Sequence, residues 1–150
     1  MKETGRMSYS VTKVGSMLLV RWQDMTVSDI SAVRDEVSRF HRETGKPVVY
    51  VSITEEGSKP PDDDVRKAMV RSAESLMPTL AKLYVVIDTG GFMGSVHRSA
   101  LAGMLLMSKL RNKVKVVKSL DEVLTLAAAE IGVDTASARS QLSAAGVAMG

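Results

Sequence analysis

The 150-residue chain contains no cysteine, and this absence excludes several kinds of chemistry. Without a thiol the chain can form no iron–sulfur cluster, no zinc site that uses cysteine and no thiolate nucleophile. Histidine is also scarce, because only His41 and His97 are present, and no Gly-x-Ser-x-Gly turn supplies an activated serine. We therefore expect no catalytic residue, no metal site and no cofactor.

Aromatic residues and concentrated charge are scarce as well. Aromatic side chains make up 4% of the chain and form no interleaved stacking platform of the kind that binds single-stranded nucleic acid. The net charge of +3, from 20 basic and 17 acidic residues, is too small to indicate the basic face of a nucleic-acid-binding protein. No apolar run approaches the ~20 residues of a membrane span, and no apolar segment near the start marks a secretory signal. The sequence predicts a soluble, cytoplasmic protein without a nucleic-acid partner.

What the chain does have is the size and composition of one globular domain. Hydrophobic residues make up 45% and charged residues 25% of it, which is the usual balance for a folded domain. A chain of this length can bury a core without disulfides or metal. We expect a single domain over residues 1–150, with a core at about residues 8–132 and a short helix and tail over residues 133–150.

The hydrophobic pattern predicts a β-hairpin followed by alternating helices and strands. Two apolar segments on either side of Gly15-Ser16 form the hairpin, and Thr26 and Gly45 bound the first helix. The later elements are a strand at 47–53, a helix from Pro61 to Pro78, a strand at 83–87, a helix from Ser95, a strand at 114–117, a helix from Ser119 to Gly132 and a short last helix. The predicted buried stripe of the second helix is Val65, Met69, Ala73, Leu76 and Leu80. The alternation predicts an α/β fold with a mixed, mostly parallel sheet.

This order of elements resembles the STAS domain, the fold of bacterial anti-sigma-factor antagonists and of sulfate-transporter tails. The resemblance spans Tyr9 to Ile131. Within this range the chain is more narrowly similar to stand-alone STAS-like proteins, which are grouped with sporulation anti-sigma antagonists and lipid-binding Sec14-type domains. It rests on the element order, on the core strands Val48–Ile53 and Val85–Ile87, and on the segment Ser119–Ala127, where the last strand is followed by a helix. It implies a non-enzymatic regulatory or protein-interaction module with an unidentified protein partner.

One feature of the antagonists is missing from the chain. Their phosphorylatable serine lies in an Asp-Ser-Ser-Gly motif, which occurs nowhere in this sequence. By element order the motif would fall within Gly57 to Asp64, where Ser58 is followed by three aspartates. The nearest local likeness, Phe92-Met93-Gly94-Ser95, lies one strand–helix unit later. A phosphoserine switch is therefore not carried over to either serine.

The stretch from Asp88 to Ser99 is the candidate binding site, because it follows a central strand and opens a helix. Ligands of open α/β sheets bind at the carboxyl ends of strands, and glycines beside a helix N-terminus let backbone N–H groups approach an anion. Arg98 could pair with a phosphate or carboxylate, and His97 could move a proton. The candidate ligand- or partner-binding residues are Asp88, Thr89, Gly90, Gly91, Ser95, His97 and Arg98. The alternative is a simple turn followed by a helix cap.

Three further features each allow a structural and a functional interpretation. The aspartates at 62–64 could bind a cation or only favour a helix N-terminus. A basic cluster could contact acidic lipid or nucleic acid, or protect an edge strand and a helix end; its members are Lys109, Arg111, Lys113, Lys115 and Lys118. The ten methionines could form an adaptable surface or belong to the core.

Two alternative functions and one assembly state remain open at this point. The chain could be a small-ligand or anion-binding sensor or an enzyme that uses the Asp88–Ser99 stretch, or a peripheral lipid-associated domain. The segment Tyr9–Val14 is an expected edge strand, through which a homodimer could form.

Overall fold

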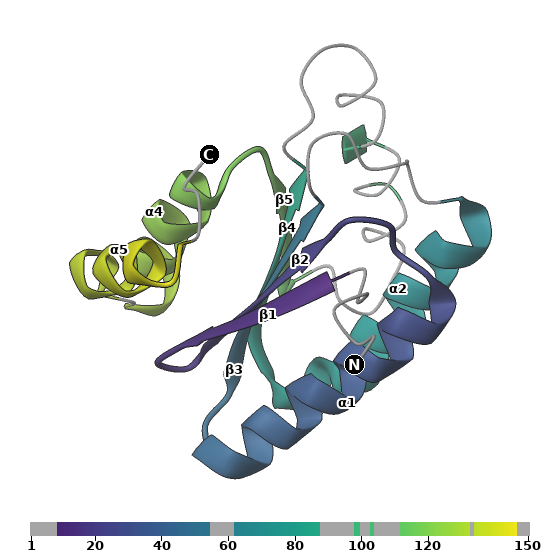
Figure 1. Ribbon diagram of the computed structural model, residues 1–150, viewed down its shortest axis with the longest axis horizontal. Coiled ribbons are helices and arrows are strands. Elements are labelled where there is room, and N and C mark those ends of the chain that lie inside the picture. The colour runs from purple at the N-terminus through teal and green to yellow at the C-terminus, as the bar shows by residue number, and fades with distance from the viewer. Residues whose placement is uncertain are drawn as a thin grey trace.

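A single five-stranded sheet forms the centre of the protein in its computed structural model (Figure 1). The strands are β1 (Tyr9–Val14), β2 (Met17–Trp22), β3 (Val48–Thr54), β4 (Leu80–Ile87) and β5 (Val114–Val117), and they lie side by side in that order. β1 is antiparallel to β2, and all later neighbours are parallel. The structure describes residues 9–54, 62–87, 98–99, 103, 112–132 and 134–146. The predicted α/β class, with an N-terminal hairpin and a mostly parallel sheet, is confirmed.

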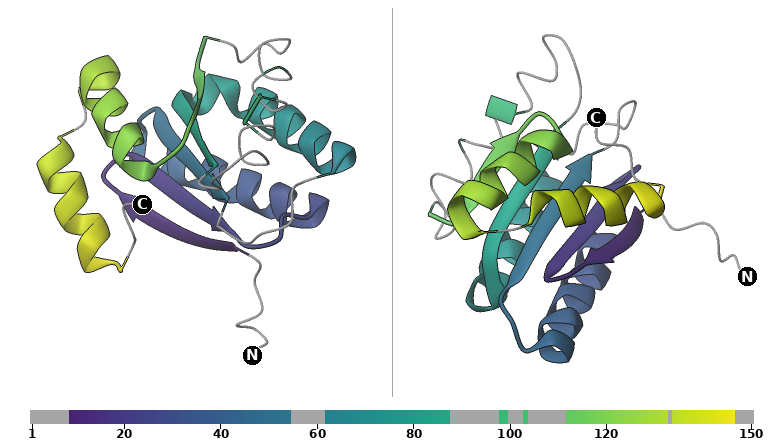
Figure 2. Two further views of the ribbon diagram at one scale, coloured as in Figure 1. Left: turned by 90° about the horizontal axis from the view of Figure 1, so that it is seen from above. Right: turned by 90° about the vertical axis from the view of Figure 1, so that its left-hand side faces the viewer.

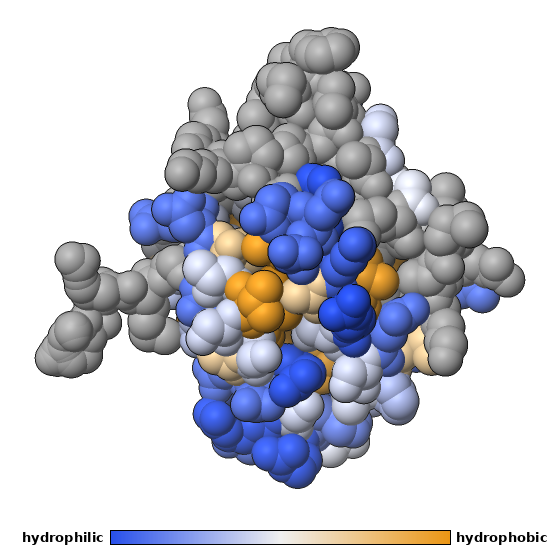
Figure 3. All heavy atoms as spheres, turned by 90° about the vertical axis from the view of Figure 1, so that its right-hand side faces the viewer, coloured by the Kyte–Doolittle hydropathy of each residue, from blue (hydrophilic) through white to orange (hydrophobic). Residues whose placement is uncertain are grey.

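Helices cover both faces of the sheet. α1 (Val27–Thr44) and α2 (Asp63–Leu76) pack on one face, and α4 (Leu120–Ile131) and α5 (Thr135–Ala144) pack on the other (Figures 1 and 2). Successive strand residues point to opposite faces, so Leu18 joins the core under α1 and α2 whereas Leu19 joins the core under α4 and α5. The face of the molecule on the side of α1 and α2 is mostly hydrophilic, with several hydrophobic residues visible near its centre (Figure 3). No helix in the described part of the chain is long and apolar enough to cross a membrane.

Local sequence signals explain where α1 begins and ends. The Thr26 hydroxyl accepts a hydrogen bond from the Asp29 backbone N–H at 3.1 Å, which satisfies one of the unpaired donors of the first turn. At the other end Gly45 adopts a left-handed conformation with φ of 67°, which glycine reaches without steric cost. Both ends confirm the predicted boundaries.

α4 begins at Ser119, as predicted, with a variant of the capping box. The Ser119 hydroxyl accepts from the Glu122 backbone N–H at 3.1 Å. The Glu122 carboxylate reaches back to the backbone N–H of Lys118, also at 3.1 Å, rather than to that of Ser119. The cap therefore also fixes the residue that leaves β5.

The second helix, α2, differs from its prediction at its start and in its buried stripe. Asp62 caps it by accepting from the Val65 N–H at 2.9 Å, so the helix begins at Asp63, and Pro61 lies outside the described residues. Pro78 ends the helix as expected, through the 3-10 turn η1 (Met77–Thr79). Leu80 is buried, but it belongs to β4 and not to the helix stripe, because the chain turns into the sheet directly after η1.

The core extends past residue 132, its predicted end. Ala138 and Leu142 of α5 are 3% and 0% exposed and pack with the residues of α4 and the sheet. They lie four residues apart, on one face of the helix. The predicted short helix is therefore confirmed, but it is part of the core rather than an appendage.

Candidate functional site

Most of the predicted Asp88–Ser99 site lies outside the described residues. This holds for Asp88, Thr89, Gly90, Gly91, Ser95 and His97. It also holds for most of the helix predicted from Ser95, of which Arg98, Ser99 and Gly103 are described and helical. The structure therefore places one of the seven predicted site residues, Arg98.

Arg98 lies at the carboxyl end of a central strand. Its Nη1 donates to the carbonyl oxygen of Ile87 at 2.9 Å, and Ile87 is the last residue of β4. A hydrogen bond from a charged donor stabilises by roughly 1.5–3 kcal/mol, so this contact holds Arg98 against the end of the strand. Arg98 is half-buried.

A depression of about 290 Å³ opens beside Arg98. Its lining residues come from three places: the helical segment, the end of β5 and the first turn of α4. They are Arg98, Ser99, Val116, Val117, Lys118 and Glu122. The depression therefore lies just beyond the carboxyl ends of parallel strands, where open α/β sheets bind their ligands.

The walls of this depression combine an apolar floor with a charged rim. Val117 is buried and Val116 half-buried, whereas Ser99, Lys118 and Glu122 are exposed. The Glu122 carboxylate is held by the Lys118 backbone N–H. Two cationic side chains, one of them anchored on β4, thus stand beside one fixed carboxylate. Such a rim can receive a carboxylate or phosphate group.

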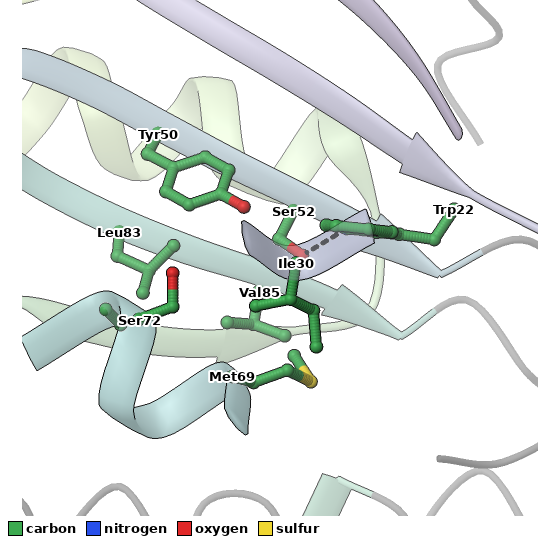
Figure 4. A pocket seen from close by; sticks show the side chains of 9 residues that line it. Trp22, Ile30, Tyr50, Ser52, Met69, Ser72, Leu83 and Val85 are labelled. Carbon is green, nitrogen blue, oxygen red and sulfur yellow. Dashed lines mark hydrogen bonds between the residues drawn. The ribbon is translucent and has the colours of Figure 1, made fainter. Parts of the chain in front are cut away.

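A second cavity, not predicted from the sequence, lies between the sheet and the α1 and α2 layer (Figure 4). At its edge the Trp22 indole N–H donates to the Ser52 hydroxyl at 2.9 Å. Ser52 is 4% exposed, so its hydroxyl lies inside the core. Burial raises the pKa of the nearby Tyr50 phenol well above its usual value, and a side-chain hydrogen bond with Ser52 opposes that rise. A serine inside the otherwise apolar strand Val48–Ile53 was the signal that could have revealed this cluster.

The predicted basic cluster is not one surface patch in the part of the chain that can be described. The Lys113 ammonium donates to the carbonyl oxygens of Met77 at 3.0 Å and Leu80 at 2.9 Å, so it fixes the turn before β4. Lys115 and Lys118 are exposed on and after β5, which is an edge strand. Lys109 and Arg111 lie outside the described residues.

The aspartates at 62–64 act as a helix start. Asp62 is the N-cap, and the Asp63 carboxylate pairs with Arg66 one turn later. Negative charge at this end of a helix is favoured by the helix dipole. Within the described ranges no group of three or more acidic or histidine side chains is placed to hold a metal ion.

The remaining candidates lie in helix ends and in the core. His41 Nδ1 donates to the carbonyl oxygen of Lys46 at 2.8 Å and so ties the end of α1 to the following loop. Met17 is buried, and Met69 and Met77 pack as half-buried residues against the core. Met104 and Met107 lie outside the described residues. Met17, Met69 and Met77 therefore fill space between elements.

The comparisons with known protein families, characterised proteins and solved structures find no match for this chain. The α/β fold is shown by its own topology. The resemblance to STAS domains remains a prediction from the sequence.

Proposed function

We propose that the chain is a non-enzymatic regulatory module of the STAS-like type, which binds a protein partner at the carboxyl ends of β4 and β5. The observation that carries the proposal is the 290 Å³ depression lined by Arg98, Ser99, Lys118 and Glu122 above Val116 and Val117. An apolar floor within a polar rim is the usual anatomy of a protein interface.

The charge of the rim selects the chemistry of the partner. Arg98 and Lys118 are the two cations of the depression, and Glu122 is bound to the backbone of Lys118. Carboxylate or phosphate groups on a partner segment would pair with these cations, and the fixed Glu122 would repel a second anion placed beside it. We therefore expect an acidic protein segment rather than a basic one.

The size of the depression favours a docked segment over an enclosed small molecule. Pockets for small molecules usually measure about 300–1,000 Å³ and bury most of the ligand. The depression, at about 290 Å³, has the volume of a very small pocket of this kind, but three of its lining residues are exposed, so a small molecule in it would stay open to solvent. One or two side chains of a bound segment would fill it.

The test is a titration with labelled peptides of opposite charge, followed by fluorescence polarisation. We expect an acidic decapeptide to bind and a basic one to fail. Lys118→Glu should weaken the acidic peptide by roughly tenfold, equivalent to about 1.4 kcal/mol. Lys115→Glu is the matched control, because Lys115 is also exposed and belongs to β5 but does not line the depression. Both variants change the net charge equally, so long-range attraction cannot separate them.

The two alternative functions are outcomes of the same experiment. Inorganic phosphate that binds with the same dependence on Lys118, while acidic peptide does not bind, would replace the proposal with an anion sensor. Binding to vesicles of anionic lipid, but not to peptide, would replace it with a lipid-associated domain. Equal weakening by Lys118→Glu and Lys115→Glu would show that the depression is not the binding site.

A further inference from the structure

The cavity between the sheet and α2 brings three hydroxyl groups together (Figure 4). Tyr50 and Ser52 reach it from β3, and Ser72 reaches it from α2. The remaining walls are mostly apolar and come from Ile30, Met69, Leu83 and Val85 among others. Hydroxyl groups in such surroundings need hydrogen-bond partners, because burying them unpaired costs about 1–3 kcal/mol each.

The hydrogen bonds among Tyr50, Ser52 and Trp22 leave one O–H donor without an acceptor. Ser52 and Tyr50 are 4% and 8% exposed, so bulk water reaches neither side chain freely. The Ser52 oxygen already accepts the Trp22 indole N–H at 2.9 Å. If Ser52 donates to Tyr50, the phenol hydrogen needs another acceptor, and if Tyr50 donates to Ser52, the serine hydrogen needs one. Either arrangement leaves one buried O–H without an acceptor inside the pair.

Ser72 lies across the cavity from this pair and is half-buried. Its hydroxyl points from α2 toward the sheet in the close-up view (Figure 4). Within the described part of the chain, no residue is in direct hydrogen-bond contact with the Ser72 hydroxyl. The three hydroxyls thus line one cavity, but the hydrogen bonds among them do not satisfy every donor.

We propose that this cavity binds one ordered water molecule, which joins the Ser72 hydroxyl on α2 to the hydroxyls of Tyr50 and Ser52 on β3. The cavity measures about 30 Å³. One water molecule needs roughly 10–15 Å³ and two to four polar partners, whereas a drug-sized ligand needs several hundred Å³. Three hydroxyls and this volume therefore fit a single water molecule. The water accepts from the leftover O–H and donates to the other two oxygens, so that every hydroxyl gains a partner.

The direct test is a high-resolution crystal structure of the full chain, together with NMR detection of water contacts. We expect a solvent peak within about 2.5–3.0 Å of the Tyr50, Ser52 and Ser72 oxygens. We also expect magnetisation transfer from long-lived water to the Trp22 indole N–H. An ordered cluster around an empty cavity would overturn the proposal, and so would a direct Ser72–Tyr50 hydrogen bond.

A pair of variants measures what the water contributes. Ser72→Ala removes one of its three partners, and Ser75→Ala makes the same change at an exposed position of the same helix. The difference between the two variants cancels the helix propensity of alanine. We expect Ser72→Ala to melt about 2–4 °C below Ser75→Ala, and the water signal at the Trp22 indole to weaken only in Ser72→Ala. Equal melting temperatures with an unchanged water signal would refute a water bound to Ser72. The measurements on the unmodified chain decide the matter even if a variant fails to fold.

Discussion

Lys113 joins the turn before β4 to the start of β5, and its replacement tests whether a half-buried lysine stabilises this corner. Its Nζ donates to the carbonyl oxygens of Met77 at 3.0 Å and Leu80 at 2.9 Å. Its own backbone carbonyl accepts from the Leu83 N–H at 2.8 Å. Lys113→Met keeps the length and the apolar part of the side chain but removes the three donors, so the loss reports on the hydrogen bonds.

The magnitude follows from what each carbonyl loses. A hydrogen bond from a charged donor contributes roughly 1.5–3 kcal/mol. The Met77 carbonyl also accepts from the Leu80 N–H, so it is not left unpaired in the variant. Lys113 is only half-buried, so water can replace part of the second bond. We therefore expect the free energy of unfolding to fall by about 1.5–3 kcal/mol in total, well below the sum for two unpaired carbonyls.

The assay is urea unfolding, with thermal melting beside it. The expected loss corresponds to a melting temperature lower by about 3–12 °C for a domain of this size. Lys115→Met is the control, because Lys115 is exposed on β5 and the change in charge is the same. If the two variants lie within about 0.5 kcal/mol of each other, which is the usual range for surface substitutions, then Lys113 does not hold the turn.

Two further predictions concern the interior. Val86 on β4 is 1% exposed, so Val86→Ala should lower the free energy of unfolding by about 1–4 kcal/mol in urea titrations, and a loss below about 0.5 kcal/mol would show that β4 is not a central strand. Burial raises the pKa of Tyr50, so the unfolded chain loses this proton first as the pH rises past about 10, and the free energy of unfolding should then fall by up to ~1.4 kcal/mol per pH unit. Tyr50→Phe should flatten this alkaline decline relative to its own value at neutral pH, and an unchanged slope would contradict the burial of the phenol.

Features that depend on neighbouring residues were the ones that the sequence predicted well. The start of α1 at Thr26, its end at Gly45 and the cap of α4 at Ser119 each require only a few consecutive residues. The same holds for the break at Pro78, which lacks the N–H that a continuing helix needs. Together with the alternation of apolar strands and amphipathic helices, these signals define the α/β class.

Features that depend on distant residues were missed. The hydrogen bonds of Lys113 reach residues 36 and 33 positions earlier, and nothing near Lys113 in the sequence distinguishes it from the exposed Lys115. Ala138 and Leu142 lie in a segment rich in alanine and serine, whose composition suggests a tail. Their burial is decided by the surface of α4 and the sheet, against which α5 packs. The candidate depression was missed as well, because its residues at the end of β5 lie far from Arg98 in the sequence.

The contact between Ser52 and Trp22 shows why the pattern of apolar residues could not predict the register between β2 and β3. β3 is apolar on both faces, so a shift of one residue against β2 would leave its buried faces almost equally apolar. In the observed register Ser52 pairs with Val20, which lies two residues before Trp22 on β2. Ser52 and Trp22 therefore point to the same face of the sheet, and the Ser52 hydroxyl lies within reach of the indole N–H. A slip by one residue would turn Ser52 toward α4 and α5, where its hydroxyl would lose the indole, at a cost of about 1–3 kcal/mol. Ser52 thus helps to select the register that the apolar residues leave open.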